Sequence, residues 1–313
     1  MGPQGMTSLS SRNVLCGCGT IDKIWFVVKL LERLSSVVPL AHQKRLSSVH
    51  RHGDLLLSQT TQCTTGNELL AQLWVKPRTF EIVKARWEVN RSEDEDLPTI
   101  SEIPFLEGIV AYFGCGKSVS QALGSYPPVA TELFLENVRA LIQAESYLID
   151  ERGFPSLDAY VDYWKEFYIG SCRYYSNLEA VKRSWAEYVS GRKPGTNLFN
   201  RFKTLALDRC NDGLLLRASM ADSFHEMALS VRLDPAGETV REATGAIIRA
   251  PDRVCPEAAT FVHRLKEINL PAAERNELAS LLGEGEGCVH LIELAFESAA
   301  LLRDARFKVK LKN

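Results

Sequence analysis

The residues best suited to chemistry are two cysteines and two histidines in the C-terminal third of the chain. Cys288 and His290 follow a glycine-rich acidic turn, and His225 and Cys255 come earlier in the same region. Thiolates and imidazoles arranged in a tetrahedron are the ligands that a soft divalent ion such as zinc prefers. The set His225, Cys255, Cys288 and His290 therefore predicts a metal site for zinc or iron, although only Cys288 and His290 are close in sequence.

The same residues allow two other interpretations. Cys288 follows Gly287 at the start of an expected helix, where the helix dipole lowers the pKa of a thiol. With His290 as base, Cys288 would attack a small acyl or thioester-like substrate, although residues two apart point to different sides of a helix. In the third interpretation the cysteines are small buried apolar residues and the histidines are hydrogen-bonded fillers.

The elements that must position these residues occur twice along the chain. The first region has expected strands at 55–57, 69–75 and 80–89 and helices at 104–113, 117–123 and 132–148, after a strand pattern that begins near Arg45. The second has expected strands at 202–207, 214–218, 226–233 and 239–248 and helices at 256–268, 272–282 and 289–303. Strands followed by helices indicate an α+β domain in each region.

The two regions align at a nearly constant offset of about 158 residues. The matched pairs are Glu68 with Glu226, Val75 with Leu233, Pro77 with Pro235, Ala85 with Ala243, Arg91 with Arg249 and Pro98 with Pro256. The four metal-ligand candidates correspond to Asn67, Leu97, Val129 and Thr131, which ligate weakly or not at all. We therefore predict a duplicated domain in which the first copy is degenerate and the second carries the site.

The predicted architecture is a tandem repeat of two similar domains, each a small, mostly antiparallel sheet with helices on one face. We expect a leader and N-terminal helix over 1–40, the first repeat over 41–150, a helical spacer over 151–196 and the second repeat over 197–313. The two copies are expected to pack as a pseudo-dimer, in the manner of an isologous homodimer fused in one chain. The spacer would join them.

Aromatic residues crowd into the spacer, where two helices are expected. They are Tyr160, Tyr163, Trp164, Phe167, Tyr168, Tyr174, Tyr175, Trp185 and Tyr188. Rings at helical spacing are typical of a core or an interface, and the alternative is an aromatic-lined ligand pocket or a groove for a partner.

Composition excludes several classes of function. The net charge is −2 over 313 residues, which gives no overall field for nucleic acid or an anionic membrane. The apolar run at 24–31 is too short to span a bilayer, and eight scattered cysteines do not indicate a disulfide framework.

Gly116-Lys-Ser118 lacks the opening glycine of a phosphate loop, because Ala111 stands in its place. A cytoplasmic protein with reduced thiols is expected.

The second half resembles a bacterial domain-of-unknown-function family over about residues 201–298. The resemblance rests on Phe224-His-Glu-Met, Leu233-Asp-Pro, Arg249-Ala-Pro, Cys255-Pro and the closing Leu281-Leu-Gly-Glu-Gly-Glu-Gly-Cys-Val-His-Leu291. That family ends in a Leu-Leu-Gly-Gly…Gly-Cys-Thr-His-Leu signature, and Val289 stands where it has threonine. More distantly, the pattern is similar to the NifU and IscU scaffold fold, which would place Cys255, Cys288 and His290 on a metal. No match for the first cysteine and the aspartate of that scaffold is found.

These observations favour a non-catalytic binding or accessory protein that holds a metal or a small ligand in its second repeat. A protein partner or a homo-oligomer would complete its role. The alternative is an enzyme that uses Cys288 or His290. The sequence does not specify a substrate or a pathway.

Overall fold

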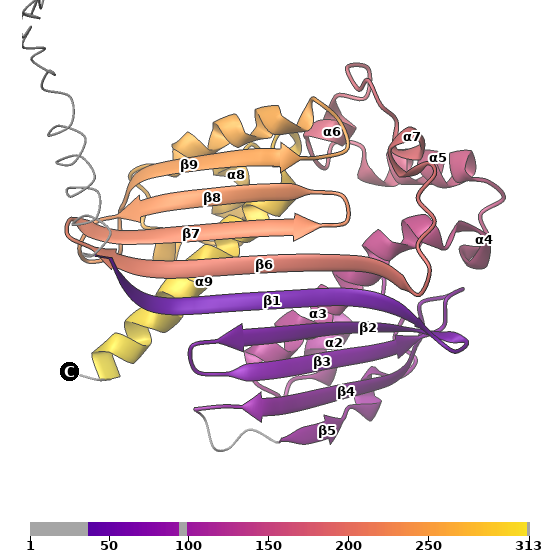
Figure 1. The fold of residues 1–313 in the computed structure, drawn as a ribbon, viewed down its shortest axis with the longest axis horizontal. Helices are drawn as coiled ribbons and strands as arrows, with labels where there is room; N and C mark the ends of the chain where they lie inside the picture. Colours follow the sequence, from indigo (N-terminus) through magenta and orange to yellow (C-terminus); the bar gives the residue numbers. More distant parts are fainter. Residues whose placement is uncertain (1–36, 94–98, 312–313) are drawn as a thin grey trace, which may run out of the picture. The chain divides into compact units, whose positions relative to one another are not determined.

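The chain folds around a single antiparallel sheet with strand order β5-β4-β3-β2-β1-β6-β7-β8-β9 (Figure 1). The structure is a computed structural model that describes residues 37–93 and 99–311, with side chains to residue 305 at the C-terminal end. The chain from Val38 onward forms one compact unit. The expected leader and most of the N-terminal helix, together with much of the acidic loop at 92–96, lie outside the described residues.

The first half supplies one side of the sheet. Its elements are β1 (Val38–His52), β2 (Leu55–Thr64), β3 (Glu68–Val75), β4 (Ile82–Arg91), β5 (Ile100–Glu102), the 3-10 turn η1 (Pro104–Leu106), α2 (Gly116–Ala122), α3 (Pro128–Ala144) and η2 (Glu145–Tyr147). The spacer contains α4 (Ile149–Arg152), α5 (Leu157–Tyr168), α6 (Arg173–Ser176) and α7 (Trp185–Val189).

The second half supplies the other side. Its elements are β6 (Asn197–Cys210), β7 (Gly213–Asp222), β8 (Glu226–Leu233), β9 (Val240–Arg249), η3 (Cys255–Leu265), η4 (Leu270–Ala272), α8 (Arg275–Leu281), η5 (Glu284–Glu286) and α9 (Val289–Leu311). The α+β class is confirmed, but the strands of the two halves join into one sheet instead of two small ones. The join is the β1–β6 pair, in which Arg45 faces Lys203 and Leu46 faces Phe202.

The strand pairing in the two halves follows the same pattern. In β3–β4, Glu68 pairs with Arg91 and Val75 with Ile82, with irregularities after the first pair and before the last. In β8–β9, Glu226 pairs with Arg249 and Leu233 with Val240, with irregularities at the same places. The descent of both halves from one copied domain stays a prediction.

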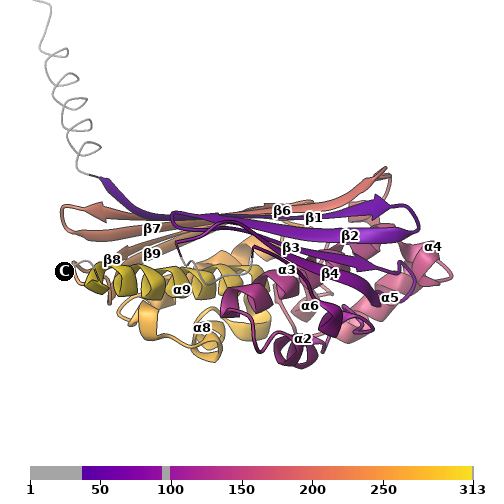
Figure 2. The same cartoon turned by 90° about the horizontal axis from the view of Figure 1, so that it is seen from below.

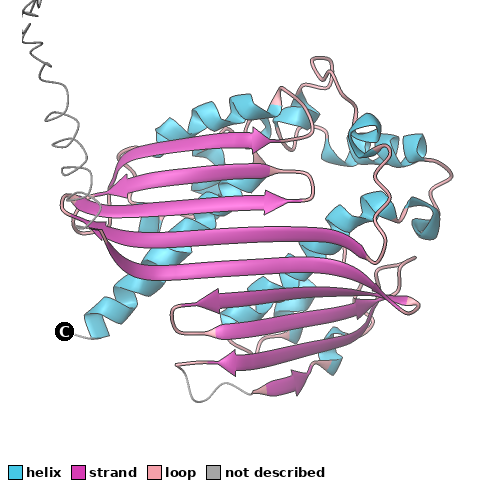
Figure 3. Cartoon of the chain, in the orientation of Figure 1, coloured by secondary structure: helices cyan, strands magenta, loops and turns pink. Residues whose placement is uncertain are grey.

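All the described helices lie on one face of the sheet (Figures 2 and 3). Alternation explains this arrangement, because successive strand residues point to opposite faces and the residues facing the helices are mostly apolar. Leu69, Ala71, Leu73 and Val75 of β3 are buried. On the opposite face, Phe202 and Ile248 are exposed, and no described helix covers them.

Several local predictions were wrong. The expected helix at 104–113 is reduced to η1, because the backbone at Gly108 and Gly114 takes positive φ values that interrupt a helix. The segment at 255–265 is a 3-10 helix, and the first strand begins at Val38, not near Arg45. None of the described helices is both long and apolar enough to cross a bilayer.

Candidate functional site

The turn between β7 and β8 fixes the first histidine of the site. Asp222 Oδ1 accepts hydrogen bonds from the backbone N–H groups of Phe224, at 2.8 Å, and His225, at 2.6 Å. An aspartate that bonds to the backbone two or three residues later stabilises such a turn. The same Oδ1 lies 3.2 Å from His225 Nδ1, so the carboxylate also orients the ring and leaves His225 Nε2 without a described partner.

The start of α9 brings the second histidine to the first. The ring centroids of His225 and His290 lie 4.4 Å apart, and Cys288 Sγ lies 3.9 Å from His290 Nδ1. The expectation that Cys288 and His290 point to different sides was wrong. Cys288 precedes the first residue of α9, so helical spacing does not separate the two side chains.

Burial sets the ionisation of this group. It raises the pKa of the Cys288 thiol to about 12, more than the backbone N–H groups of Leu291 and His290 lower it. Burial, with His225 and Arg201 nearby, lowers the pKa of His290 to about 3, so its imidazole is neutral at physiological pH. The expected lowering of the thiol pKa at the helix start is therefore wrong, because loss of water outweighs the helix dipole.

A pocket of about 310 Å³ opens beside these residues. Its walls come from the spacer, from the C-terminal half of α3, from β8 and β9, and from the start of α9. The aromatic residues lining it are Phe113, Tyr160, Trp164, Tyr168, Tyr174, Tyr175 and Trp185. The volume lies near the lower end of the roughly 300–1,000 Å³ typical of small-molecule pockets.

The aromatic residues of the spacer serve as core and pocket wall at once. Trp164 and Tyr168 stack with centroids 4.5 Å apart, and Tyr175 stacks on Tyr168 at 5.3 Å. Tyr160 and Trp164 also belong to the buried core of the first half. The same aromatic side chains therefore form part of the core and part of the pocket wall, as the two interpretations of the cluster expected.

Polar contacts fasten the spacer to the second half. Asp252 Oδ2 accepts from the backbone N–H groups of Lys182, at 2.9 Å, and Arg183, at 2.8 Å. Ser176 Oγ donates to the carbonyl of Gly285 at 2.7 Å. A Cβ atom on Gly285 would lie 2.2 Å from the carbonyl oxygen of Gly170, so only glycine permits this approach. The spacer and the turn before α9 are thus held as one wall.

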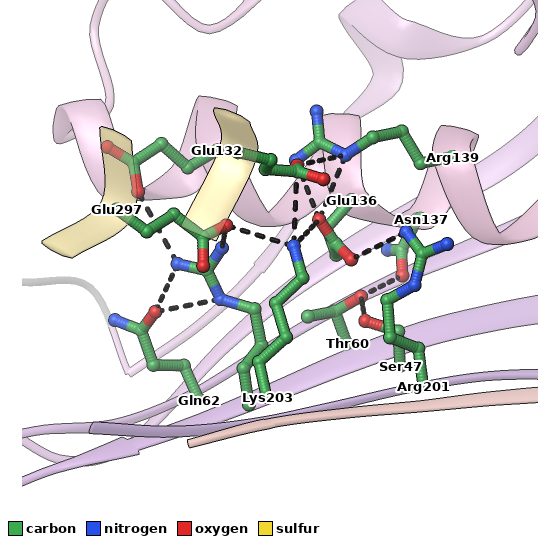
Figure 4. Close-up of polar contacts among 12 residues, drawn as sticks. Ser47, Thr60, Gln62, Glu132, Glu136, Asn137, Arg139, Arg201, Lys203 and Glu297 are labelled. Atoms are coloured by element: carbon green, nitrogen blue, oxygen red, sulfur yellow. Dashed lines mark hydrogen bonds and ion pairs between the residues drawn. The ribbon is translucent and has the colours of Figure 1, made fainter. Parts of the chain in front are cut away.

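A network of buried charges lies between the sheet and helices α3 and α9 (Figure 4). Lys203 Nζ lies 3.1 Å from Glu136, 3.3 Å from Glu293 and 2.9 Å from Glu297. Arg45, its partner across the β1–β6 pair, contacts Glu297 at 3.2 Å. Like charges opposite each other destabilise a sheet, and the glutamates of the two helices offset that repulsion.

The network reaches the pocket through two arginines. Arg201 Nε and Nη2 donate to Asp222 Oδ2 at 3.1 and 2.8 Å. Burial raises the pKa of Asp222, but Arg201 and His225 together hold it well below its ordinary value. Arg139 donates to Glu136 Oε2 at 2.9 and 2.6 Å, and Arg139 also lines the pocket.

Two groups in the described part of the chain bring three metal-ligating atoms within 4.8 Å of one another. In the group of Glu136, Glu293 and Glu297, the Lys203 ammonium already takes the place of a cation. In the group of Asp222, His225 and His290, both oxygens of Asp222 already accept hydrogen bonds, so this carboxylate is suited to orient the His225 ring and not to bind an ion itself. The donors left for a soft metal are His225 Nε2, His290 and Cys288.

Residues 211–303 match a family described as "Protein of unknown function (DUF2889)". This match covers the second half without β6 and is consistent with the expected resemblance to a domain of unknown function. No curated protein matches the chain, and no solved structure matches it. The likeness to the NifU and IscU scaffold and the closing signature stay predictions.

All four predicted ligands lie in the DUF2889 region and line the same pocket. His225 and His290 come together and Cys288 contacts His290, whereas Cys255 is in neither group of close metal-ligating atoms in the described chain. Burial raises the pKa of Cys255 to about 11.

Sequence reasoning missed Asp222, Cys172 and Arg139. Asp222 precedes His225 by three residues at a strand end, a spacing typical of an Asx turn, and this was an available signal. Cys172 and Arg139 lie outside the DUF2889 region, and both line the pocket. Neither carries a local signal, since each gains its role from the packing of the spacer and α3 on the second half.

Proposed function

We propose that this chain is a non-catalytic binding protein that holds a small molecule in the pocket of its second half. The observation that carries the proposal is the pocket of about 310 Å³ itself, which is lined by aromatic residues and by polar residues that include His225, His290 and Arg139. An apolar wall with a few convergent polar groups is the usual form of a small-molecule site.

The duplication hypothesis belongs to this proposal. One domain would have been copied, the first copy would have kept the framework, and the second would have kept the site. The equal register of β3–β4 and β8–β9 supports it. Asn67 and Thr131 stand where the second half has His225 and His290, so the first half lacks the imidazole pair.

A soft metal is the second candidate occupant, and one observation favours it. A carboxylate that holds one ring nitrogen of a histidine, as Asp222 holds His225, is the common support of a metal ligand. His225, Cys288 and His290 would bind zinc or iron, with Cys255 reaching the ion after a rearrangement. A bound zinc ion would either stabilise the fold or bind the ligand.

The enzyme alternative has less support. A nucleophilic thiol must ionise near neutral pH, and the pKa of Cys288 is raised to about 12 by burial. The nearest base, His290, is neutral, but its Nδ1 lies 3.9 Å from the sulfur, beyond a strong hydrogen bond to a thiol.

The binding proposal is tested with the neutral fluorophore Nile red, titrated into the full chain. Ile247 lines the pocket, whereas its neighbour Ile248 is exposed on the opposite face of the sheet. Ile247→Trp should weaken binding at least about tenfold by filling space. Ile248→Trp is the matched control and should bind like the wild type. Equal binding by both variants would exclude the pocket as the site.

The metal candidate is tested with Co²⁺ and Zn²⁺ added to chelator-treated protein. Thiolate coordination gives Co²⁺ a strong near-ultraviolet charge-transfer band, which Cys288→Ser and His225→Ala should abolish. Cys63→Ser and His263→Ala, at exposed positions, serve as controls. If Cys288→Ser and His225→Ala each still bind one equivalent of metal, the ion does not bind at this site. A cytoplasmic location and a protein partner or homo-oligomer remain part of the proposal.

A further inference from the structure

We propose that the ligand is an organic carboxylate with an apolar body, and that Arg139 and Gln143 bind its carboxylate. This inference rests on the proposed small-molecule function. It depends on the direction in which the pocket's polar groups point and on which of their hydrogen-bonding atoms already have partners.

Arg139 offers one unused edge of its guanidinium. Its Nε and Nη2 donate to Glu136, and Nε also lies 3.0 Å from Glu293 Oε1. Nη1 has no hydrogen-bond partner among residues 37–93 and 99–311. Figure 4 shows one terminal nitrogen of Arg139 turned away from the network. The side chain is 37% exposed although its neighbour Glu136 is fully buried, and Arg139 is among the residues that line the pocket.

Gln143 supplies a second donor on the same face of α3. It lies four residues after Arg139 on α3, so the two side chains share a helix face. Both line the pocket, and the amide of Gln143 has no hydrogen-bond partner within the described chain. A guanidinium N–H pair next to an amide N–H₂ matches the two oxygens of a carboxylate.

The charges that face the pocket favour an anion. Among the described residues, four arginines line it, Arg139, Arg173, Arg201 and Arg275, and Glu293 is the acidic residue of the lining. Arg173 is paired with Glu257 and Glu286, which do not line the pocket. Glu293 is held by Arg139 and Lys203, which lower its pKa to about 2 against the opposing effect of burial. The carboxylates that pair with Arg201, those of Asp222 and Glu136, do not border the pocket.

The aromatic wall argues against the competing ligand class, a quaternary ammonium. Such a cation needs open ring faces around it. Trp164 and Tyr175 both stack on Tyr168, with ring centroids 4.5 and 5.3 Å away, so the face of this ring is already occupied by other rings. The wall therefore provides apolar contact for a ring or chain, while Arg139 and Gln143 of α3 bind the charged group of the ligand.

Three probes with one body and different head groups test this inference on the full chain: 2-naphthoate, 2-naphthamide and 2-naphthyltrimethylammonium. Binding is followed by quenching of the fluorescence of Trp164 and Trp185, which line the pocket. The naphthoate should bind about tenfold or more tightly than the amide, as expected for hydrogen bonds to a charged group. The ammonium should bind most weakly.

Variants locate the head group. Arg139→Met should remove the preference for naphthoate while amide binding persists, and Gln143→Leu should reduce the preference several-fold. Arg139→Lys keeps a cation for Glu136 and Glu293 but removes Nη1, so it should lose the preference for naphthoate as Arg139→Met does. It also provides the test if Arg139→Met does not fold. Arg241→Met, at an exposed position of β9, is the matched control.

The outcomes separate two kinds of failure. If the amide or the ammonium binds as tightly as the naphthoate, the carboxylate inference is overturned while the pocket remains a binding site. The same holds if Arg139→Lys, Gln143→Leu and Arg241→Met behave alike. If neither Nile red nor any naphthyl probe binds saturably, the proposed function itself fails, and this inference fails with it.

Discussion

Replacing Lys203 by methionine should expose how the buried charge network stabilises the fold. The Lys203 side chain is 1% exposed, and its ammonium contacts the carboxylates of Glu136, Glu293 and Glu297 within 3.3 Å. Among side chains that are at most 11% exposed on the acidic side, the network sets four cations against four carboxylates, namely Arg45, Arg139, Arg201 and Lys203 against Glu136, Asp222, Glu293 and Glu297. Glu132, which also contacts Arg45, is 56% exposed and lies outside this balance. The variant leaves three against four. Removing one partner of a buried ion pair costs about 3–5 kcal/mol, and we expect a loss of that size in the free energy of unfolding.

The pH dependence gives the sharper test. In the wild type, burial raises the pKa of Glu293 and Glu136, but Lys203 and Arg139 more than offset it, so both values are depressed. A depressed carboxylate pKa contributes stability that is present above the unfolded pKa and is lost as pH falls through the folded pKa. In Lys203→Met these pKa values rise, so a carboxylate takes up a proton on mild acidification. The destabilisation relative to wild type should therefore be smaller at pH 5 than at pH 8.

Urea denaturation of wild type and variant at both pH values measures these quantities. Lys76→Met is the matched control, because Lys76 is 51% exposed in a surface pair with Glu81 and should contribute less than about 1 kcal/mol. Adding Glu297→Gln to Lys203→Met restores a balance of three to three and should recover part of the loss. A cost for Lys203→Met as small as that of the control, or equal at both pH values, would refute the reasoning.

Three further predictions concern the pocket wall. Gly285→Ala should destabilise the protein by about 1–3 kcal/mol and speed alkylation of Cys288, because the new Cβ would lie 2.2 Å from the Gly170 carbonyl oxygen; unchanged alkylation would contradict this. Iodoacetamide at pH 7.5 should modify the exposed Cys63 well before Cys288, whose pKa is raised to about 12, and peptide mass spectrometry reads the order. Asp252→Ala should cost about 1–3 kcal/mol at pH 7 by freeing backbone N–H groups of the spacer. Burial raises the pKa of Asp252, but its hydrogen bonds lower it further, so this cost should shrink in acid; a constant cost in urea melts would count against it.

Local pattern was enough to predict much of the fold. The expected strands at 69–75 and 226–233 lie within β3 and β8, because alternation and turn residues define each hairpin from nearby sequence. The β1–β6 pair could not be predicted in the same way. Its partners, such as Arg45 and Lys203, lie far apart in the chain, and two facing cations would have argued against the pairing. Only the glutamates of α3 and α9 make it favourable.

The candidate site likewise has residues that the sequence predicted and residues whose role depends on contacts between distant parts of the chain. Comparison of the two halves singled out His225 and His290, and the structure places their rings 4.4 Å apart. Arg139 and Glu136 look in sequence like an ordinary surface pair of one helix, and their burial depends on the sheet beneath them. The thiol pKa of Cys288 was predicted in the wrong direction, because sequence shows the helix start but not the loss of water around the sulfur.

The placement of β6 in the middle of the sheet determines which part of the chain can be transplanted. The DUF2889 region begins at residue 211, after β6 has ended, so a fragment cut to that region would present β7 as a bare edge. Its unpaired N–H and C=O groups would recruit strands from other molecules. The smallest fragment that could transfer the site to another protein therefore begins at β6. The recipient protein must supply a strand that pairs with β6 in place of β1.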